Sequence, residues 1–241
     1  MSQPSILDVG SKTKLYTTGN GPGNRTFSLD VPANANTVAV QVGLDTDATS
    51  TNVITGLSSS GLTGAVQLFD LDTSADNIRA ARTGIYDVRS CGAGTLTVTA
   101  AMGSSRGEVC IASVVMTDGY LESVHTFVDR VMDRGRVNLH SGNSANNIAV
   151  MLGTIDGDQS TFSFSGTGVV ELFNTNASGD SFAGFAGSQA TSVNDVKTMT
   201  YTNSVSGDEL AATLILFSTQ PNAFGDIDPR GDIISHDIIT N

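Results

Sequence analysis

The stretch TGAVQLFD at residues 63–70 decides the fold of this chain, because it returns as TGVVELFN at residues 167–174. Further matching blocks flank it in the same order: Phe27–Leu29 with Val137–Leu139, Ala35–Gly43 with Ala145–Gly153, Thr95–Thr99 with Thr198–Thr202, and Glu108–Ala112 with Glu209–Thr213. The offset between the copies is 110 residues at the first block and 101 at the last, as expected if the second copy has shorter loops. Ordered repeats of this kind indicate an internal duplication of one structural unit.

Each copy contains short segments with the pattern of β-strands. Polar and apolar residues alternate in Thr95–Thr99, which is typical of a strand with one buried and one wet face. In the first copy, seven strands are predicted near residues 26–31, 37–43, 52–57, 63–71, 78–87, 94–101 and 108–116. This spacing predicts a β-sandwich or a jelly roll, and the sequence leaves the choice between the two topologies open.

The composition also favours an all-β protein. The 241-residue chain has 20 Asp but only four Glu and three Lys, and Glu and Lys are residues that favour exposed helix faces. Hydrophobic residues make up 39%, enough for a core, and charged residues only 15%. The net charge of −12 argues against nucleic acid and anionic membranes as partners, since both carry negative charge.

We therefore expect two tandem β-sandwich domains, jelly-roll-like in character, that arose by internal duplication. The first would span residues 1–117 with an N-terminal arm, and the second residues 135–218, with a linker at 118–134 and a C-terminal tail at 219–241.

The expected linker has two interpretations. Helical spacing allows a short helix at Leu121, Val124, Val128 and Val131. The repeat alignment sets the same region opposite a predicted strand, and we favour a strand plus a linker.

The compartment is indicated by the N-terminus and by the cysteines. The segment MSQPSILDVG has no positive charge and no apolar run, so we expect no secretory signal. No segment approaches the roughly 20 apolar residues of a membrane span. Cys91 and Cys110 are expected in neighbouring strands, where they would pair only if those strands lie in register. We favour two buried thiols in a chain made in a reducing cytosol.

Catalytic motifs are missing from the sequence. The three histidines are His125, His140 and His236, and no Gly-x-Ser-x-Gly turn is present, which disfavours a nucleophilic hydrolase. With 24 acidic residues a glycosidase-like carboxylate pair stays open, but the chain has no Trp and only 6% aromatic residues for stacking on a sugar. No glycine motif for phosphate or dinucleotide binding occurs. We expect no enzyme.

Closely spaced aspartates are the best candidates for a metal site. Asp45 and Asp47, and likewise Asp70 and Asp72, place carboxylates two residues apart in predicted loops, where they could share a hard cation such as Ca²⁺. Neither pair fits the helix-loop-helix calcium motif, and aspartates also cap ordinary turns with their own side chains. Calcium and ordinary turns both remain open, with ordinary turns favoured.

The C-terminal tail carries two apolar pairs, Ile233-Ile234 and Ile238-Ile239. The tail could pack on its own domain, or the four isoleucines could bind a neighbouring subunit as an added strand. The sequence does not decide between these alternatives.

In overall character the whole chain resembles virion structural proteins of tailed bacteriophages and tailed archaeal viruses, a group that includes decoration (cement), fibre and neck proteins of β-sandwich type. The resemblance implies a virion subunit without enzymatic activity, assembled in the host cytoplasm and associated as a homo-oligomer, with a trimer favoured. The acidic charge suits an outer surface, so we expect a capsid decoration protein that binds the major capsid protein or other virion proteins. The alternatives are a fibre-tip or adhesin module that binds a host glycan or protein and, less favoured, a glycosidase-like or esterase-like enzyme.

Overall fold

The described residues form β-strands and the turns that join them. The computed structural model describes residues 4–15, 23–46, 54–73, 80–102, 107–129, 134–140, 147–156, 162–177, 182–190, 196–203 and 209–219. The strands of the first half are β1 (Ile6–Leu15), β2 (Gly23–Val31), β3 (Thr37–Thr46), β4 (Ile54–Ser60), β5 (Val66–Asp72), β6 (Ala80–Asp87), β7 (Gly94–Met102) and β8 (Gly107–Thr117). Those of the second half are β9 (Tyr120–Asp129), β10 (Arg134–His140), β11 (Ile148–Asp156), β12 (Phe162–Ser165), β13 (Val169–Ala177), β14 (Phe182–Ala190), β15 (Val196–Asn203) and β16 (Glu209–Ser218). These ranges contain no helix, and the all-β prediction is confirmed.

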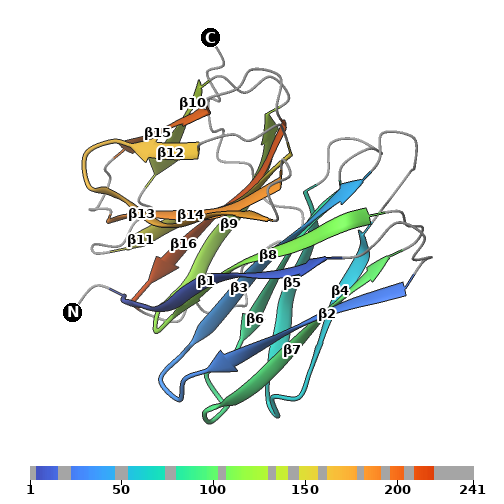
Figure 1. Ribbon diagram of the computed structural model, residues 1–241. Helices are drawn as coiled ribbons and strands as arrows, with labels where there is room; N and C mark the ends of the chain where they lie inside the picture. Colours follow the sequence, from blue (N-terminus) through green and yellow to red (C-terminus); the bar gives the residue numbers. More distant parts are fainter. Residues whose placement is uncertain are drawn as a thin grey trace.

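The strands pair in four antiparallel sheets. The first half forms a five-stranded sheet in the order β1-β8-β3-β6-β5 and a three-stranded sheet in the order β2-β7-β4. The second half forms the sheets β13-β14-β11-β16-β9 and β10-β15-β12. Figure 1 shows the four sheets as successive layers, with the two five-stranded sheets in the middle and a three-stranded sheet on each outer side.

The strand order of the second half repeats that of the first. Each strand from β9 to β16 has the same neighbours as the strand eight places before it. Thus β8 lies between β1 and β3, and β16 lies between β9 and β11.

Alternating side chains build the first sandwich. In β2, Phe27 and Leu29 are buried while Thr26 and Ser28 are exposed, so every second residue faces the core. In β7, Leu96 is buried in the same way and forms one apolar cluster with Phe27 and Leu29. This alternation explains why the sequence pattern located these strands.

The central strand β3 is buried on both faces. Val38, Val40 and Val42 belong to the core of the first sandwich. Ala39 belongs to a second apolar cluster, which contains Phe217 and other side chains from the second half. A strand covered on both sides reads as a nearly continuous apolar run, as this one does.

The N-terminal arm expected to precede the first unit is a strand. Residues 6–15 form β1, which pairs with β8 at the edge of the five-stranded sheet. Its strand pattern is weak, because Gly10, Lys12 and Lys14 have low β-propensity. Lysines are typical of edge strands, where they discourage pairing with other chains.

The strand favoured within residues 118–134 is confirmed. Residues 120–129 form β9, which pairs with β16, and only Asp118 and Gly119 separate β8 from β9. The helical alternative is wrong, and its cause is clear. A bulge leaves Glu122 out of the pairing, so Leu121 and Val124 both pack against the same cluster while lying three residues apart.

Candidate functional site

The two halves meet through their five-stranded sheets. Strand β8 packs against β14 and β11, β3 packs against β11, and β1 packs against β13. The buried apolar residues of this interface are Ala39, Ile85, Val115, Leu121, Val150, Leu152, Ile215 and Phe217. Since one apolar cluster draws on both halves, separating them would expose it to water.

Hydrogen bonds between buried side chains cross the same interface. The Gln41 amide donates to the carbonyl oxygen of Ala211 at 2.7 Å. The hydroxyl oxygens of Thr83 and Thr213 lie 2.7 Å apart, and Ser113 donates to the β11 backbone at 3.1 Å. These side chains are fully buried, so a shift of one sheet along the other would leave polar groups unpaired at a cost.

The connection between the two halves is fixed by hydrogen bonds. The Asp118 carboxylate accepts from the backbone N–H of Ser5 and, at 2.6 Å, from the Ser5 hydroxyl. The Thr117 hydroxyl donates to the Ser5 carbonyl at 2.6 Å. Thr37 donates to the carbonyl oxygen of Gly119 at 2.9 Å. The start of the chain and the start of β3 therefore hold the passage from β8 to β9.

Gly119 stands where no larger residue fits. A Cβ atom at this position would lie 2.8 Å from the Pro4 Cβ and 3.0 Å from the Phe217 Cβ. Pro4 precedes β1, and Phe217 is in β16, so the glycine allows close approach of both halves at the connection.

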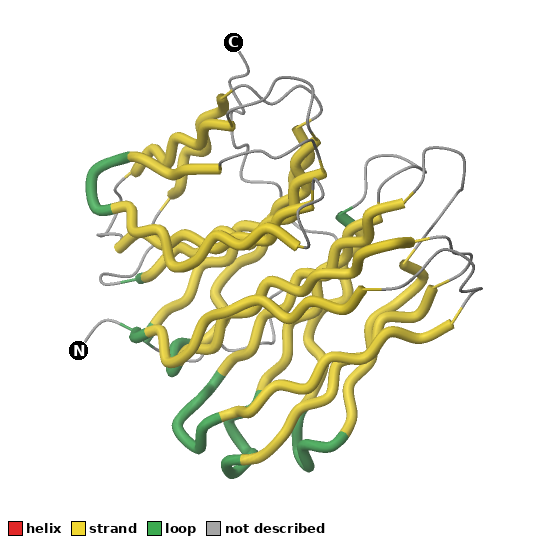
Figure 2. Tube along the Cα trace, in the orientation of Figure 1, coloured by secondary structure: helices red, strands yellow, loops and turns green. Residues whose placement is uncertain are grey.

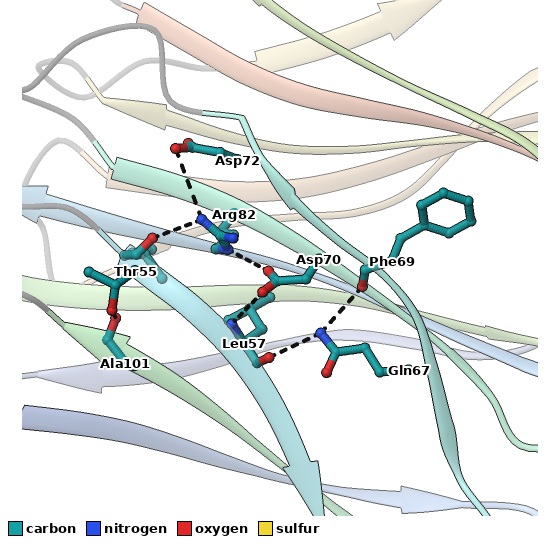
Figure 3. A network of polar contacts seen from close by, with 9 residues as sticks. Thr55, Leu57, Gln67, Phe69, Asp70, Asp72, Arg82 and Ala101 are labelled. Carbon is teal, nitrogen blue, oxygen red and sulfur yellow. Dashed lines mark hydrogen bonds and ion pairs between the residues drawn. The ribbon is translucent and has the colours of Figure 1, made fainter. Parts of the chain in front are cut away.

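Polar side chains join the edges of β4 and β5, which are not paired by backbone hydrogen bonds (Figure 3). Asp70 accepts from the backbone N–H of Leu57 at 3.2 Å, and Gln67 donates to the Leu57 carbonyl at 3.0 Å. Arg82 forms an ion pair with Asp70 and donates to the Ile54 carbonyl at 3.2 Å. These side chains satisfy edge groups of β4 that would otherwise need water.

Tyr86 lies buried next to this group. Its ring covers Gly84, since a Cβ atom on Gly84 would lie 2.6 Å from the Tyr86 hydroxyl oxygen. That hydroxyl has no hydrogen-bond partner among the described residues. Burial, and to a lesser extent the Asp70 carboxylate, raise the pKa of Tyr86.

The predicted calcium ligands are placed only in part. Asp70 and Asp72 lie in strand β5 and not in a loop, and the positive charge near both is Arg82, whose guanidinium is 4.0 Å from the Asp72 carboxylate. The side chain of Asp45 and the whole of Asp47 lie outside the described residues. Within the described ranges, no three His, Cys, Asp or Glu side chains lie close enough to hold a metal ion.

The remaining predicted residues have mixed outcomes. Cys91 and Cys110 are both buried and no disulfide joins them, and Cys91 follows β6 in a turn, not in a strand as expected. Burial raises the pKa of the Cys91 thiol, which makes it a weak nucleophile. The partner-binding candidates Ile233, Ile234, Ile238 and Ile239 lie outside the described residues.

A turn repeated at the sheet edges of both halves was not predicted from the sequence. In the first half, Ala65 donates its N–H to the carbonyl of Leu62 at 3.3 Å, and Gly64 has a φ of 91°. In the second half, Val169 donates to Gly166 at 3.2 Å, and Gly168 has a φ of 78°. The signal was present in the repeated Thr-Gly of the matching stretches, because a positive φ favours glycine.

A matching irregularity follows each turn. The pairing of β5 with β6 is interrupted between Gln67 and Phe69, and that of β13 with β14 between Glu171 and Phe173. The turns of both halves that are described lie along the left and lower sides of the molecule in Figure 2.

No helix suited to crossing a membrane is found among the residues that the structure describes. No protein-family model, curated protein or solved structure matches this chain.

Proposed function

We propose that this chain is a virion structural protein without enzymatic activity, and that it is a decoration, or cement, protein on the outer surface of a capsid. Its partners would be the major capsid protein or other virion proteins. The observation that carries the proposal is the buried hydrogen-bonded interface between the two halves, which joins two sandwiches into one body. Sliding one half along the other would leave these buried polar groups unpaired, and resistance to sliding suits a subunit that reinforces a particle.

We further propose that the halves are two jelly-roll-like sandwiches from an internal duplication. Three features support this: the repeated strand order, the repeated turn at Gly64 and Gly168, and the repeated bulge. In the first half, the order β1-β8-β3-β6 beside β2-β7-β4 follows a jelly roll, with β5 attached to β6.

Several charged side chains form ion pairs that hold strands together, which is consistent with this function. Arg82 is paired with Asp70, and Arg89 forms an ion pair with Asp87. The Arg89 guanidinium also lies 5.5 Å from the centre of the Tyr120 ring, at the start of the second half. These contacts hold strands together, and the net charge of −12 suits a surface that faces away from packaged DNA.

The oligomer and the tail remain part of the proposal. A trimer is what the resemblance to virion proteins implies, and the isoleucine pairs of the tail would bind a neighbouring subunit. A calcium ion at Asp45 and Asp47 would be an addition to this function and not a requirement for it.

Binding to capsids tests the proposal. Purified protein is mixed with expanded empty capsids of the virus that encodes it, and the bound fraction is measured after sedimentation. We expect saturable binding. A chain that does not bind capsids but binds host cells or glycans would contradict the proposal.

A second candidate function has its own supporting observation. The outer face of β2-β7-β4 presents exposed hydroxyl groups in neighbouring strands, among them Thr26, Ser28, Ser58, Ser60 and Thr95. Such a face could hydrogen-bond a glycan or a host protein in a fibre-tip module. A glycan array, with melting curves measured with and without calcium, distinguishes this function from capsid decoration.

A further inference from the structure

Val66 and Val170 are the exposed large hydrophobic residues of the described part, and each is 55% exposed. They occupy the same place in the two copies of the repeated stretch. Val66 begins β5 and Val170 lies at the start of β13, and both strands form edges of five-stranded sheets. A single exposed valine needs no explanation, but the same exposure at equivalent positions of both halves suggests a shared use.

Each valine is held by a turn of defined shape. The turn before Val66 has its glycine at a φ of 91°, and the turn before Val170 has its glycine at 78°. Thr63 and Thr167, three residues before each valine, are exposed as well. A side chain on a rigid turn loses little freedom on binding, which favours its use in a contact.

Side-chain contact suits these positions better than an added strand. The pairing of each edge strand is interrupted one residue after the valine, between Gln67 and Phe69 in β5 and between Glu171 and Phe173 in β13. Bulges at an edge twist it and hinder pairing with another chain. A partner would therefore receive the valine in a depression of its surface.

The charges near the valines indicate the chemistry of the partner. Glu171 is exposed next to Val170, and the chain as a whole carries −12. At Val66 the strand partner Asp87 is paired with Arg89, so the negative charge that a partner would meet there comes from the chain as a whole. A basic rim around an apolar depression would complement both positions. A sugar is a poorer fit, because the exposed large hydrophobic residues of the described part include no aromatic ring for stacking.

We propose that Val66 and Val170 are equivalent contact points by which one chain bridges two copies of the same partner protein, each offering a shallow apolar depression with a basic rim. This inference rests on the proposed function, since a capsid lattice presents many copies of one surface. Two linked contacts strengthen binding by about 100-fold or more over one contact.

Capsid binding by single variants tests the bridge. Val66→Asp and Val170→Asp are each compared with the wild-type chain on the same empty capsids, with Asn34→Asp as the control for added charge at an exposed turn position. Val66→Thr and Val170→Thr keep the β-branched shape and guard against a folding defect, which melting curves also exclude. We expect each Asp variant to lose about 100-fold in apparent affinity, each Thr variant to lose less, and the control to be unchanged.

The outcomes separate this inference from the proposed function. If the wild-type chain binds capsids and every variant binds equally well, the contact points are wrong and the decoration function stands. If only one valine matters, the bridge is wrong. If the wild-type chain does not bind capsids, the proposed function itself fails.

Discussion

The hydroxyl oxygens of Thr83 and Thr213 lie 2.7 Å apart, although 130 residues separate them in the sequence. Thr83 is in β6 of the first half and Thr213 is in β16 of the second half. Both are fully buried, so this hydrogen bond joins the two five-stranded sheets away from water. It belongs to the group of polar contacts that joins the two halves of the chain.

Breaking this pair on one side should cost more than replacing both partners. Thr83→Val or Thr213→Val alone leaves one buried hydroxyl without its partner, and we expect a loss of about 1–3 kcal/mol in the free energy of unfolding. The double variant, with two valines of similar shape, should lose less than the sum of the single losses. Urea unfolding of the four proteins measures the coupling, and additive losses would contradict a direct contact.

Substitution of Gly119 should loosen the connection between the halves. The Cβ of an alanine would lie 2.8 Å from the Pro4 Cβ, and we expect Gly119→Ala to destabilise the chain by about 1–3 kcal/mol. Gly92→Ala is the matched control, because nothing lies within 4 Å of a Cβ there. Thermal melting compares the two, and equal melting temperatures would argue against close packing at Gly119.

The ion pair at the edge of β4 and β5 should contribute more stability than the one at Arg89. Arg82→Met removes the ion-pair partner of the Asp70 carboxylate and the hydrogen-bond donor to the Ile54 carbonyl. We expect a loss of about 1–3 kcal/mol, because the Arg82 side chain is only 16% exposed. Arg89→Met, at a more exposed pair, should cost about 0–1 kcal/mol. Chemical denaturation ranks the two, and the reverse order would contradict the role of Arg82.

Tyr86 predicts a loss of stability at high pH. Its folded pKa is raised, so its contribution is fully present below the unfolded pKa of about 10 and is lost as the pH rises above it. Tyr86→Phe should remove this part of the pH dependence. It should also stabilise the chain by about 1 kcal/mol at neutral pH, since the buried hydroxyl has no partner among the described residues. Unfolding curves measured from neutral pH to about pH 11 test both effects, and parallel pH profiles of the two proteins would contradict them.

The strands of the first sandwich could be predicted because local alternation determines them. Strand β1 was harder to predict, since its lysines have low β-propensity. Strand β9 was predicted only against a helical alternative, because a bulge at Glu122 gives it a helical spacing. The interface between the halves could not be predicted from the sequence either. Gln41 and Ser113 look like ordinary polar strand residues, and only the stacking of two sheets buries them.

The candidate site was harder to predict than the fold. Asp70 and Asp72 suggested a cation site, but the nearest positive charge comes from Arg82 on the neighbouring strand. Strand pairing determines that neighbour, and spacing within one segment does not reveal it. The repeated turn with Val66 and Val170 was visible as sequence similarity, while the exposure of the valines needed the structure.

The copy number of this chain in purified virions tests the central claim most directly. Quantitative mass spectrometry compares its amount with that of the major capsid protein in the same particles. A decoration protein predicts a fixed ratio to the major capsid protein, with loss of the chain when the capsid surface is stripped and the tail is left intact. Absence from virions, or a few copies that remain with the tail, would contradict the claim.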